Sequence, residues 1–204
     1  MSCNFLKDSF GTYVSPELID QMYESGEEPS LGGEEGYHTA FFTDIQSFSA
    51  FSEKLTASEL VALLNQYLTD MTDVLLENNG TLDKYIGDAI MALFERSPED
   101  AVRTSLKMLK TLREYNEGRN RAGYKLIQIG VGVNTGMMIL GTLGEADRME
   151  GSVISDAVNL AARLEGLTKL YKTPLLISET TMNQLSPEVF QTRLIDRVAV
   201  KGKE

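Results

Sequence analysis

The stretch from Thr81 to Phe94 constrains the fold of this chain more than any other. Two runs of residues that favour β-strands flank the dipeptide Gly87-Asp88. A two-residue connection with glycine first is typical of a tight type II′ turn, which joins neighbouring antiparallel strands. The pattern therefore predicts a β-hairpin that carries the carboxylate of Asp88 at its tip.

A second acidic residue is a candidate partner for that carboxylate. Asp44 comes late in the apolar run His38–Ile45, which is predicted to be a strand. A lone aspartate in a turn usually serves the turn itself, so a functional role for Asp88 needs a partner. If the two strands are neighbours in one sheet, Asp44 and Asp88 meet at a strand end, where they suit hard cations such as Mg²⁺ or Mn²⁺.

Composition limits the class of protein. A chain of 204 residues with 42% hydrophobic residues suits one domain with an added segment. A net charge of −11 argues against nonspecific nucleic-acid binding and adhesion to anionic membranes. The single cysteine, Cys3, excludes an internal disulfide framework and favours a cytoplasmic location. No apolar run approaches the roughly 20 residues that span a bilayer, so we expect no direct membrane contact by this chain.

Residues 1–35 are expected to form a segment of their own. Apolar residues after Ser15-Pro16 predict a short helix, and the polar stretch Glu24–Ser30 followed by Gly32-Gly33 predicts a linker. Composition alone leaves a disordered tail equally open. Residues 36–204 then make up the main domain.

Two helices are signalled by their first residues. Thr56 and Glu59 form a capping box, which opens a helix that ends at Asn79-Gly80. Ser97-Pro98 caps a second helix. The apolar face expected for this second helix comprises Val102, Leu106, Leu109 and Leu112.

The second half of the chain continues the alternation of strands and helices. Alternating apolar residues predict a strand over 126–133, followed by a turn at 134–136, a loop over 144–155 and a helix from about Asp156. Gly130, Gly132 and Gly136 lack the spacing of a dinucleotide fingerprint, so we expect them to allow close backbone packing.

Three short elements complete the prediction: a strand over 174–177, a brief helix from Ser178 and a strand within 190–200. The order of elements predicts an α+β fold with a ferredoxin-like β-α-β-β-α-β core and additional helices and strands. His38 is the one histidine, which excludes a histidine-rich zinc site and favours a plain strand-edge residue.

Three blocks of sequence, at 42–49, 83–91 and 148–165, carry a family resemblance. In this order they resemble the catalytic domain of class III nucleotidyl cyclases, and most of all the bacterial adenylate cyclases. The resemblance covers about residues 36–204. It implies conversion of ATP to 3′,5′-cyclic AMP and pyrophosphate by two-metal-ion catalysis.

The resemblance also implies a role for particular residues near the predicted metal site. Asp44 and Asp88, with the carbonyl of Ile45, would bind two Mg²⁺ or Mn²⁺ ions about 4 Å apart. The backbone around Phe48 and Ser49 would bind the β- and γ-phosphates. The family more often has Gly-Phe-Thr at 47–49, a mild departure because backbone amides remain available.

The resemblance implies further roles for residues of the third block, at 148–165, and for Lys201. Asn159 and Arg163 lie four residues apart on one face of the predicted helix. By resemblance Asn159 orients the ribose, Arg163 neutralises charge on the α-phosphate, and Lys201 binds the triphosphate. Glycine is usual where this chain has Ser155, so we expect a shifted loop and lower activity.

Base selection rests on Lys84 and Ser152, which match the purine-reading pair of the family. Lysine can only donate hydrogen bonds, so it suits the acceptor at N1 of adenine and clashes with the donor at N1 of guanine. The serine hydroxyl both donates and accepts, so it is less decisive. ATP is therefore favoured over GTP.

The family resemblance implies a head-to-tail homodimer, in which each site takes metal ligands from one chain and base and ribose contacts from the other. It also implies that residues 1–35 are a transducer below an upstream sensor or membrane domain, and that a further strand follows Lys201. Two alternatives stay open: a guanylate cyclase, and a catalytically silent cyclase-like regulatory domain. A diguanylate cyclase is disfavoured because its Gly-Gly-acid-acid-Phe hairpin is absent.

Overall fold

The computed structural model of the chain describes residues 32–145 and 148–198. They divide into two compact units, one of residues 37–138 and 155–198 and one of residues 32–36 and 139–154. The expected domain boundary at residue 35 falls within the first strand. The helix predicted within residues 1–31 lies outside the described residues.

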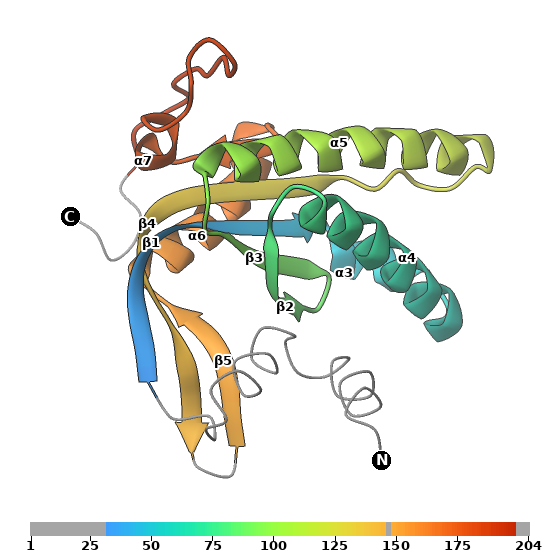
Figure 1. Ribbon diagram of the computed structural model, residues 1–204. Helices are drawn as coiled ribbons and strands as arrows, with labels where there is room; N and C mark the ends of the chain where they lie inside the picture. The colour runs from blue at the N-terminus through green and yellow to red at the C-terminus, as the bar shows by residue number, and fades with distance from the viewer. Residues whose placement is uncertain (1–31, 146–147, 199–204) are drawn as a thin grey trace. The chain divides into compact units, whose positions relative to one another are not determined.

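The strands form a sheet in the order β2-β3-β1-β4-β5, with β6 beside β4 (Figure 1). Strand β3 is antiparallel to both β1 and β2, and β6 is parallel to β4. With a helix after β1 and another after β3, the order β2-β3-β1-β4 is that of a ferredoxin-like core, which confirms the predicted fold class. The strands are β1 (Gly32–Ile45), β2 (Thr81–Ile86), β3 (Ala89–Phe94), β4 (Ile129–Glu145), β5 (Arg148–Ile154) and β6 (Leu175–Ile177).

The helices begin where their capping residues predict. In α4 the side chain of Thr56 accepts from the Glu59 amide, and the Glu59 side chain accepts from the Thr56 amide. In α5 Ser97 is the N-cap and proline occupies the first turn. Both starts confirm the sequence prediction. The described helices are α3 (Phe48–Ser52), α4 (Ala57–Leu76), α5 (Pro98–Arg121), α6 (Asp156–Tyr171) and α7 (Glu179–Met182).

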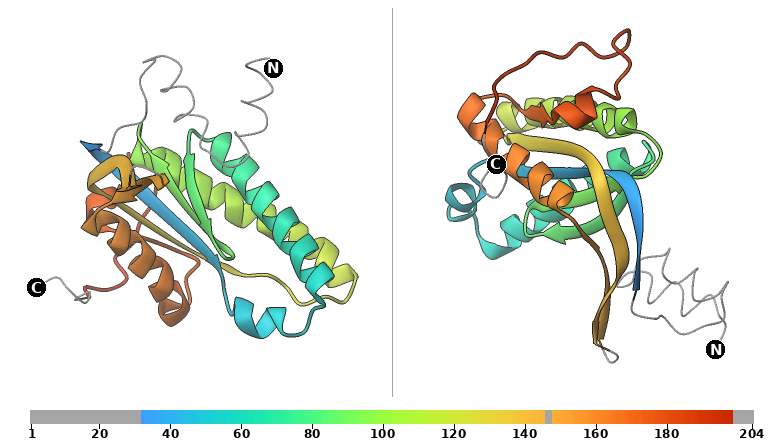
Figure 2. Two further views of the ribbon diagram at one scale, coloured as in Figure 1. Left: turned by 90° about the horizontal axis from the view of Figure 1, so that it is seen from below. Right: turned by 90° about the vertical axis from the view of Figure 1, so that its left-hand side faces the viewer.

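Helices α4 and α5 cover one face of the sheet in the larger unit and bury the main core against it (Figure 2). The expected apolar face of α5 is wrong at one position, because Leu106 is 51% exposed. The buried side of α5 instead runs through Val102, Ser105 and Met108 to Leu112. Leu106 lies on the flank of this stripe, beyond the reach of the sheet.

Helix α6 lies on the other face of the sheet, against the glycines of β4. A Cβ atom at Gly132 would collide with the main chain of Ala161 and Glu165, and one at Gly130 with the side chain of Thr168. The branched residues between the glycines face the opposite core. The expectation that these glycines allow close backbone packing is therefore confirmed.

The turn predicted at 134–136 is wrong, because β4 continues through it. Both polar side chains are buried and find partners in other elements. The Asn134 amide donates to the carbonyl of Ala157 (2.9 Å), and the hydroxyls of Thr135 and Thr39 lie 2.9 Å apart. These hydrogen bonds remove the cost of burying polar groups in the strand.

The predicted loop over 144–155 is also wrong for most of its length. Strand β5 occupies 148–154 and pairs with β4 from Ile139↔Ile154 to Glu145↔Arg148. The loop's last residue, Ser155, is the N-cap of α6. The shifted loop and lower activity expected from this serine stay predictions.

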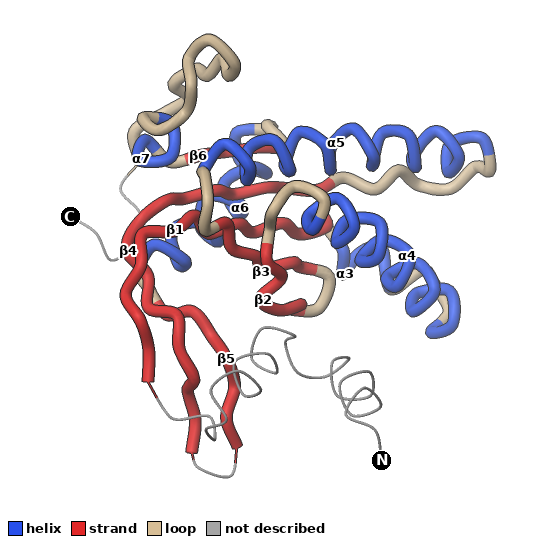
Figure 3. The backbone as a smooth tube through the Cα atoms, in the orientation of Figure 1, coloured by secondary structure: helices blue, strands red, loops and turns tan. Residues whose placement is uncertain are grey.

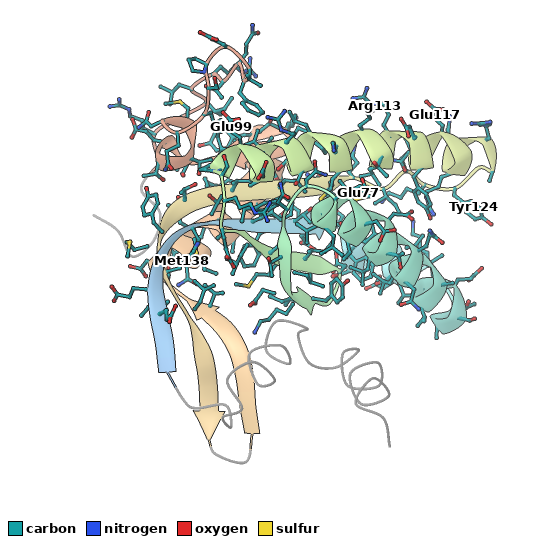
Figure 4. The ribbon with its side chains drawn as sticks, in the orientation of Figure 1. Glu77, Glu99, Arg113, Glu117, Tyr124 and Met138 are labelled. Atoms are coloured by element: carbon teal, nitrogen blue, oxygen red, sulfur yellow. The ribbon has the colours of Figure 1, made fainter. Side chains whose placement is uncertain are left out.

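The strand predicted within 190–200 is absent from the described part, residues 190–198, which forms a loop (Figure 3). Residues 191–198 are all exposed, including the apolar Leu194, Ile195 and Val198, so this segment packs no apolar side chain against the sheet. The segment after α7 contacts the start of α5 near Glu99 (Figure 4). The amide of Ser186 donates to Glu99 Oε1 (2.9 Å), and the Arg103 guanidinium lies 5.3 Å from the ring centre of Phe190.

Candidate active site

The structure brings Asp44 and Asp88 together at one end of β1 and β3. The antiparallel register pairs Thr43 with Ile90, and two further steps place Ile45 opposite Asp88. The amide of Ile45 donates to Asp88 Oδ2 at 3.1 Å. Between β2 and β3, Gly87 has φ +67° in a two-residue turn, as the predicted hairpin requires. The hairpin therefore carries the Asp88 carboxylate to the end of β1.

Burial and the Asp44 carboxylate both disfavour the charged form of Asp88. Burial raises the pKa of Asp88, and the neighbouring Asp44 carboxylate raises it further, to about 7. The hydrogen bond from the Ile45 amide acts in the opposite direction and favours the charged form. A half-buried carboxylate beside a second acid is a site that a cation stabilises.

The donor set fits a hard divalent cation. Two carboxylates with a nearby main-chain carbonyl at Ile45 are oxygen ligands of the kind that Mg²⁺ and Mn²⁺ prefer. Within residues 32–145 and 148–198, no three His, Cys, Asp or Glu side chains converge as a metal site. A cation held by Asp44 and Asp88 would therefore complete its shell with substrate oxygens or water, as Mg²⁺ usually does.

The segment that follows β1 turns sharply beside this pair. Ser47 has φ 59°, and the short helix α3 begins at Phe48, with Ser49 next in the chain. The Gln46 amide donates to the carbonyl of Gln128 (2.8 Å), so it is committed to the sheet. The amides that remain for a phosphate are those of residues 47–49.

Asn159 and Arg163 lie on α6, and both are exposed. With respect to the described residues, neither side chain has a hydrogen bond or an ion pair. The start of the helix is fixed by Ser155, whose hydroxyl accepts from the Ala157 amide (2.7 Å) and donates to the carbonyl of Met137 (2.8 Å). Both side chains thus project from the outer face of a helix whose inner face packs on β4.

The base-reading pair is described in part. Lys84 lies in β2 just after a bulge, and its ammonium is 3.8 Å from Asp83 Oδ2. Ser152 lies in β5 opposite Gly141. Lys201 lies outside the described residues. The roles of all three stay predictions.

Two residues near the acidic pair were missed by the sequence analysis. On α6, the ammonium of Lys169 is 3.8 Å from Asp44 Oδ2. One turn earlier, Glu165 is 9% exposed and is close enough to Asp44 for the two charges to interact. The spacing of four residues between them was visible in the sequence, but not the strand that they face.

No helix of the described residues is long and apolar enough to cross a membrane. His38 is half-buried in the middle of β1, which lies between β3 and β4, so the prediction of a strand-edge residue is wrong.

Comparison with known proteins identifies relatives along nearly the whole chain. The sequence model of the adenylate and guanylate cyclase catalytic domain matches residues 34–204. An adenylate cyclase of Anabaena cylindrica is 39% identical over 216 aligned positions, which cover all of this chain and 43% of that protein. An adenylate cyclase of Rhizobium meliloti is 30% identical over 96% of this chain. The chain thus spans less than half the length of these relatives.

Solved structures agree. The crystal structure of the adenylyl cyclase CyaB from P. aeruginosa has a TM-score of 0.76 and 32% identity, over 84% of this chain and 91% of that one. The guanylyl cyclase Cya2 has a TM-score of 0.69, also with 32% identity, over 84% of this chain and 85% of that one. From the family match, these relatives and the shared fold, the chain belongs to the family of adenylate and guanylate cyclase catalytic domains.

Proposed function

We propose that this domain is an adenylate cyclase, which converts ATP to 3′,5′-cyclic AMP and pyrophosphate. The observation that carries the proposal is the pairing of Asp44 with Asp88 at the end of β1, where the Ile45 amide holds Asp88 in place. Relatives named adenylate cyclase support the choice of reaction. A domain that had lost catalysis would have little reason to keep two mutually repelling carboxylates together.

The acidic pair would bind the metal ions and so would place the reacting groups. Asp44 and Asp88, with the carbonyl of Ile45, are the proposed ligands of two Mg²⁺ or Mn²⁺ ions. When bound, such ions would lower the pKa of the ribose 3′-hydroxyl and neutralise the charge of the triphosphate. The amides of residues 47–49, including those of Phe48 and Ser49, would donate to the β- and γ-phosphates.

The outer face of α6 supplies the remaining contacts near the reacting bond. Asn159 would hold the ribose so that its 3′-oxygen is in line with the α-phosphorus. Arg163 would donate to the α-phosphate oxygens, where negative charge grows as pyrophosphate leaves. Lys201 would bind the triphosphate. Among the described residues nothing occupies the Asn159 and Arg163 side chains, so they are available to a second chain.

We assign adenine recognition to Lys84 and Ser152, and assembly to a head-to-tail homodimer. Lysine donates to N1 of adenine, which accepts, and not to N1 of guanine, which donates. In the dimer, Asp44 and Asp88 of one chain would face the ribose and base contacts of its mate, and a two-fold axis would generate two equal sites. The proposal places the reaction in the cytoplasm, in keeping with a single cysteine.

The test is to incubate the purified domain with Mn²⁺ and either ATP or GTP and to identify the product by mass spectrometry. We expect cyclic AMP from ATP and far less cyclic GMP from GTP. Cyclic GMP as the main product would replace the proposal with a guanylate cyclase. No cyclic product from a folded dimer with either nucleotide would favour the silent regulatory domain.

A further inference from the structure

Helix α6 brings a positive charge to Asp44 of the acidic pair. The Lys169 ammonium lies 3.8 Å from Asp44 Oδ2. This distance is longer than a good hydrogen bond, and the lysine side chain is 47% exposed. The contact is thus an ion pair with a flexible, partly hydrated side chain, which can move away at little cost.

Glu165 makes the position of Lys169 more than a chance surface contact. Glu165 lies one turn before Lys169 on α6, and its Oε1 atom is buried without a hydrogen-bond partner among the described residues. Its pKa is raised by burial and by the charge of Asp44, and is lowered by Lys169. Lys169 therefore compensates two carboxylates, Glu165 on its own helix and Asp44 on β1.

A divalent cation at Asp44 and Asp88 would compete for the same charge. Asp44 Oδ2, the atom that contacts the ammonium, is one of the oxygens proposed to bind metal. A cation bound there would neutralise the charge of Asp44 and would repel the Lys169 ammonium. The ammonium must then move from Asp44 into solvent or toward Glu165.

We propose that Lys169 is a built-in counter-ion of Asp44 that the metal has to displace, and that it sets the metal concentration at which the domain becomes loaded. The proposal rests on the proposed metal site at Asp44 and Asp88. Lys169 acts here as a positioning residue, because it contacts a metal ligand and not the substrate.

The experiment measures Mn²⁺ binding to the nucleotide-free protein by electron paramagnetic resonance of free Mn²⁺. The variants are Lys169→Gln, Lys169→Met and Lys169→Arg. Lys110→Gln is the matched control, because it removes the same charge from an exposed ion pair on α5, on the other face of the sheet. Circular dichroism and gel filtration check that each variant folds and assembles as the original does.

We expect Lys169→Gln and Lys169→Met to bind Mn²⁺ about three- to tenfold more tightly, the scale expected for one charge at this distance with partial exposure. Lys169→Arg should keep the original affinity, because it keeps the charge. Lys110→Gln should also bind as the original does.

Three results would overturn the inference: unchanged or weaker Mn²⁺ binding by both neutral variants, equal tightening in Lys110→Gln, or equal tightening in Lys169→Arg. Each would leave the proposed function standing if the original protein binds Mn²⁺ and Asp44→Ala does not. If the original protein binds no Mn²⁺, the metal site and the inference fail together.

Discussion

The acidic pair and the outer face of α6 are both parts of the candidate active site, but they differ in their contacts with the rest of the chain. Asp44 and Asp88 lie at adjoining strand ends, where the Ile45 amide donates to Asp88 and the Asp44 carboxylate raises the pKa of Asp88. Asn159 and Arg163 are exposed, with no contact to the described residues through a hydrogen bond or ion pair. The acidic pair is thus assembled within the chain, whereas Asn159 and Arg163 are exposed, as the proposed shared site requires.

The largest effect is expected from the assembled half. Asp44→Ala should reduce cyclic AMP formation about 10³-fold or more, because metal catalysis supplies several kcal/mol of barrier reduction. Steady-state assays with Mn²⁺ and ATP measure this loss. Asp73→Ala, an exposed acid on α4, is the control and should keep full activity. Normal turnover by a folded Asp44→Ala protein would contradict the assignment of Asp44 as a metal ligand. It would also contradict the contrast between the acidic pair and the outer face of α6.

Base selection sharpens the contrast by asking whether Lys84 and Ser152 contact the purine. Replacing Lys84 by Glu and Ser152 by Cys should lower kcat/KM for ATP by about 10²- to 10⁴-fold, because polar groups of the site then lose their partners. Use of GTP should appear or rise. The assay compares both nucleotides side by side. Retained preference for ATP would show that these two residues do not read the base.

Mixing two inactive variants tests whether the two halves come from different chains. Equal amounts of Asp44→Ala and Arg163→Ala that exchange subunits give about half heterodimers, in which one site collects both lesions and the other collects none. Activity should return to about a quarter of the original specific activity. Each variant mixed with itself is the control. No recovery despite proven exchange of folded subunits would contradict the shared site.

A smaller effect concerns the charge repulsion within the assembled half. The pKa of Asp88 in the folded protein is about 7, above its ordinary value of 3.8. As the pH rises, the unfolded chain therefore loses this proton at a lower pH than the folded protein does. The contribution of Asp88 to stability is therefore full below about pH 4 and is lost as the pH rises through about 7. The Asp44 carboxylate raises the pKa of Asp88, and the buried Tyr67 is close enough for its charge to interact with both acids.

The check is the melting temperature of metal-free protein, with chelator present, between pH 4 and 8. Asp88→Asn should flatten the decline toward high pH, whereas Asp73→Asn should leave the slope as it is. An equal decline in Asp88→Asn would show that ionisation of Asp88 does not cause the loss of stability at high pH.

The smallest effect is expected at the start of α6. Ser155→Gly removes the hydroxyl that accepts from the Ala157 amide and donates to Met137, at a cost of about 1 kcal/mol of unfolding free energy. Urea unfolding measures this change, and Ser155→Thr should restore most of it. Higher stability in Ser155→Gly would instead support the shifted loop expected from the sequence.

The parts of the fold that the sequence predicted well are those with local signals. Thr56 with Glu59, and Ser97 before Pro98, fix helix starts through contacts within four residues. Gly87-Asp88 fixes the hairpin through its own backbone geometry. Asp44 and Asp88 could then be brought together by assuming that neighbouring strands pair, and the register confirms that they do.

The parts that were missed depend on distant partners. The polar sequence at 134–136 predicts a turn, but its side chains are satisfied by Ala157 and Thr39, which no local pattern identifies. Strand β5 forms because β4 lies beside it. Lys169 has no motif around it, and its contact with Asp44 follows only from the packing of α6 on the sheet.

The glycines of β4 have a consequence for how such a domain can be regulated. At Gly132 the backbone of α6 packs directly against the backbone of the strand, with no side chain between them. If α6 slid along this surface, its backbone would collide with the backbone of β4. We therefore expect the helix and this part of the strand to move together. A displacement of α6 that moves Arg163 should then move Gly132 of β4 with it.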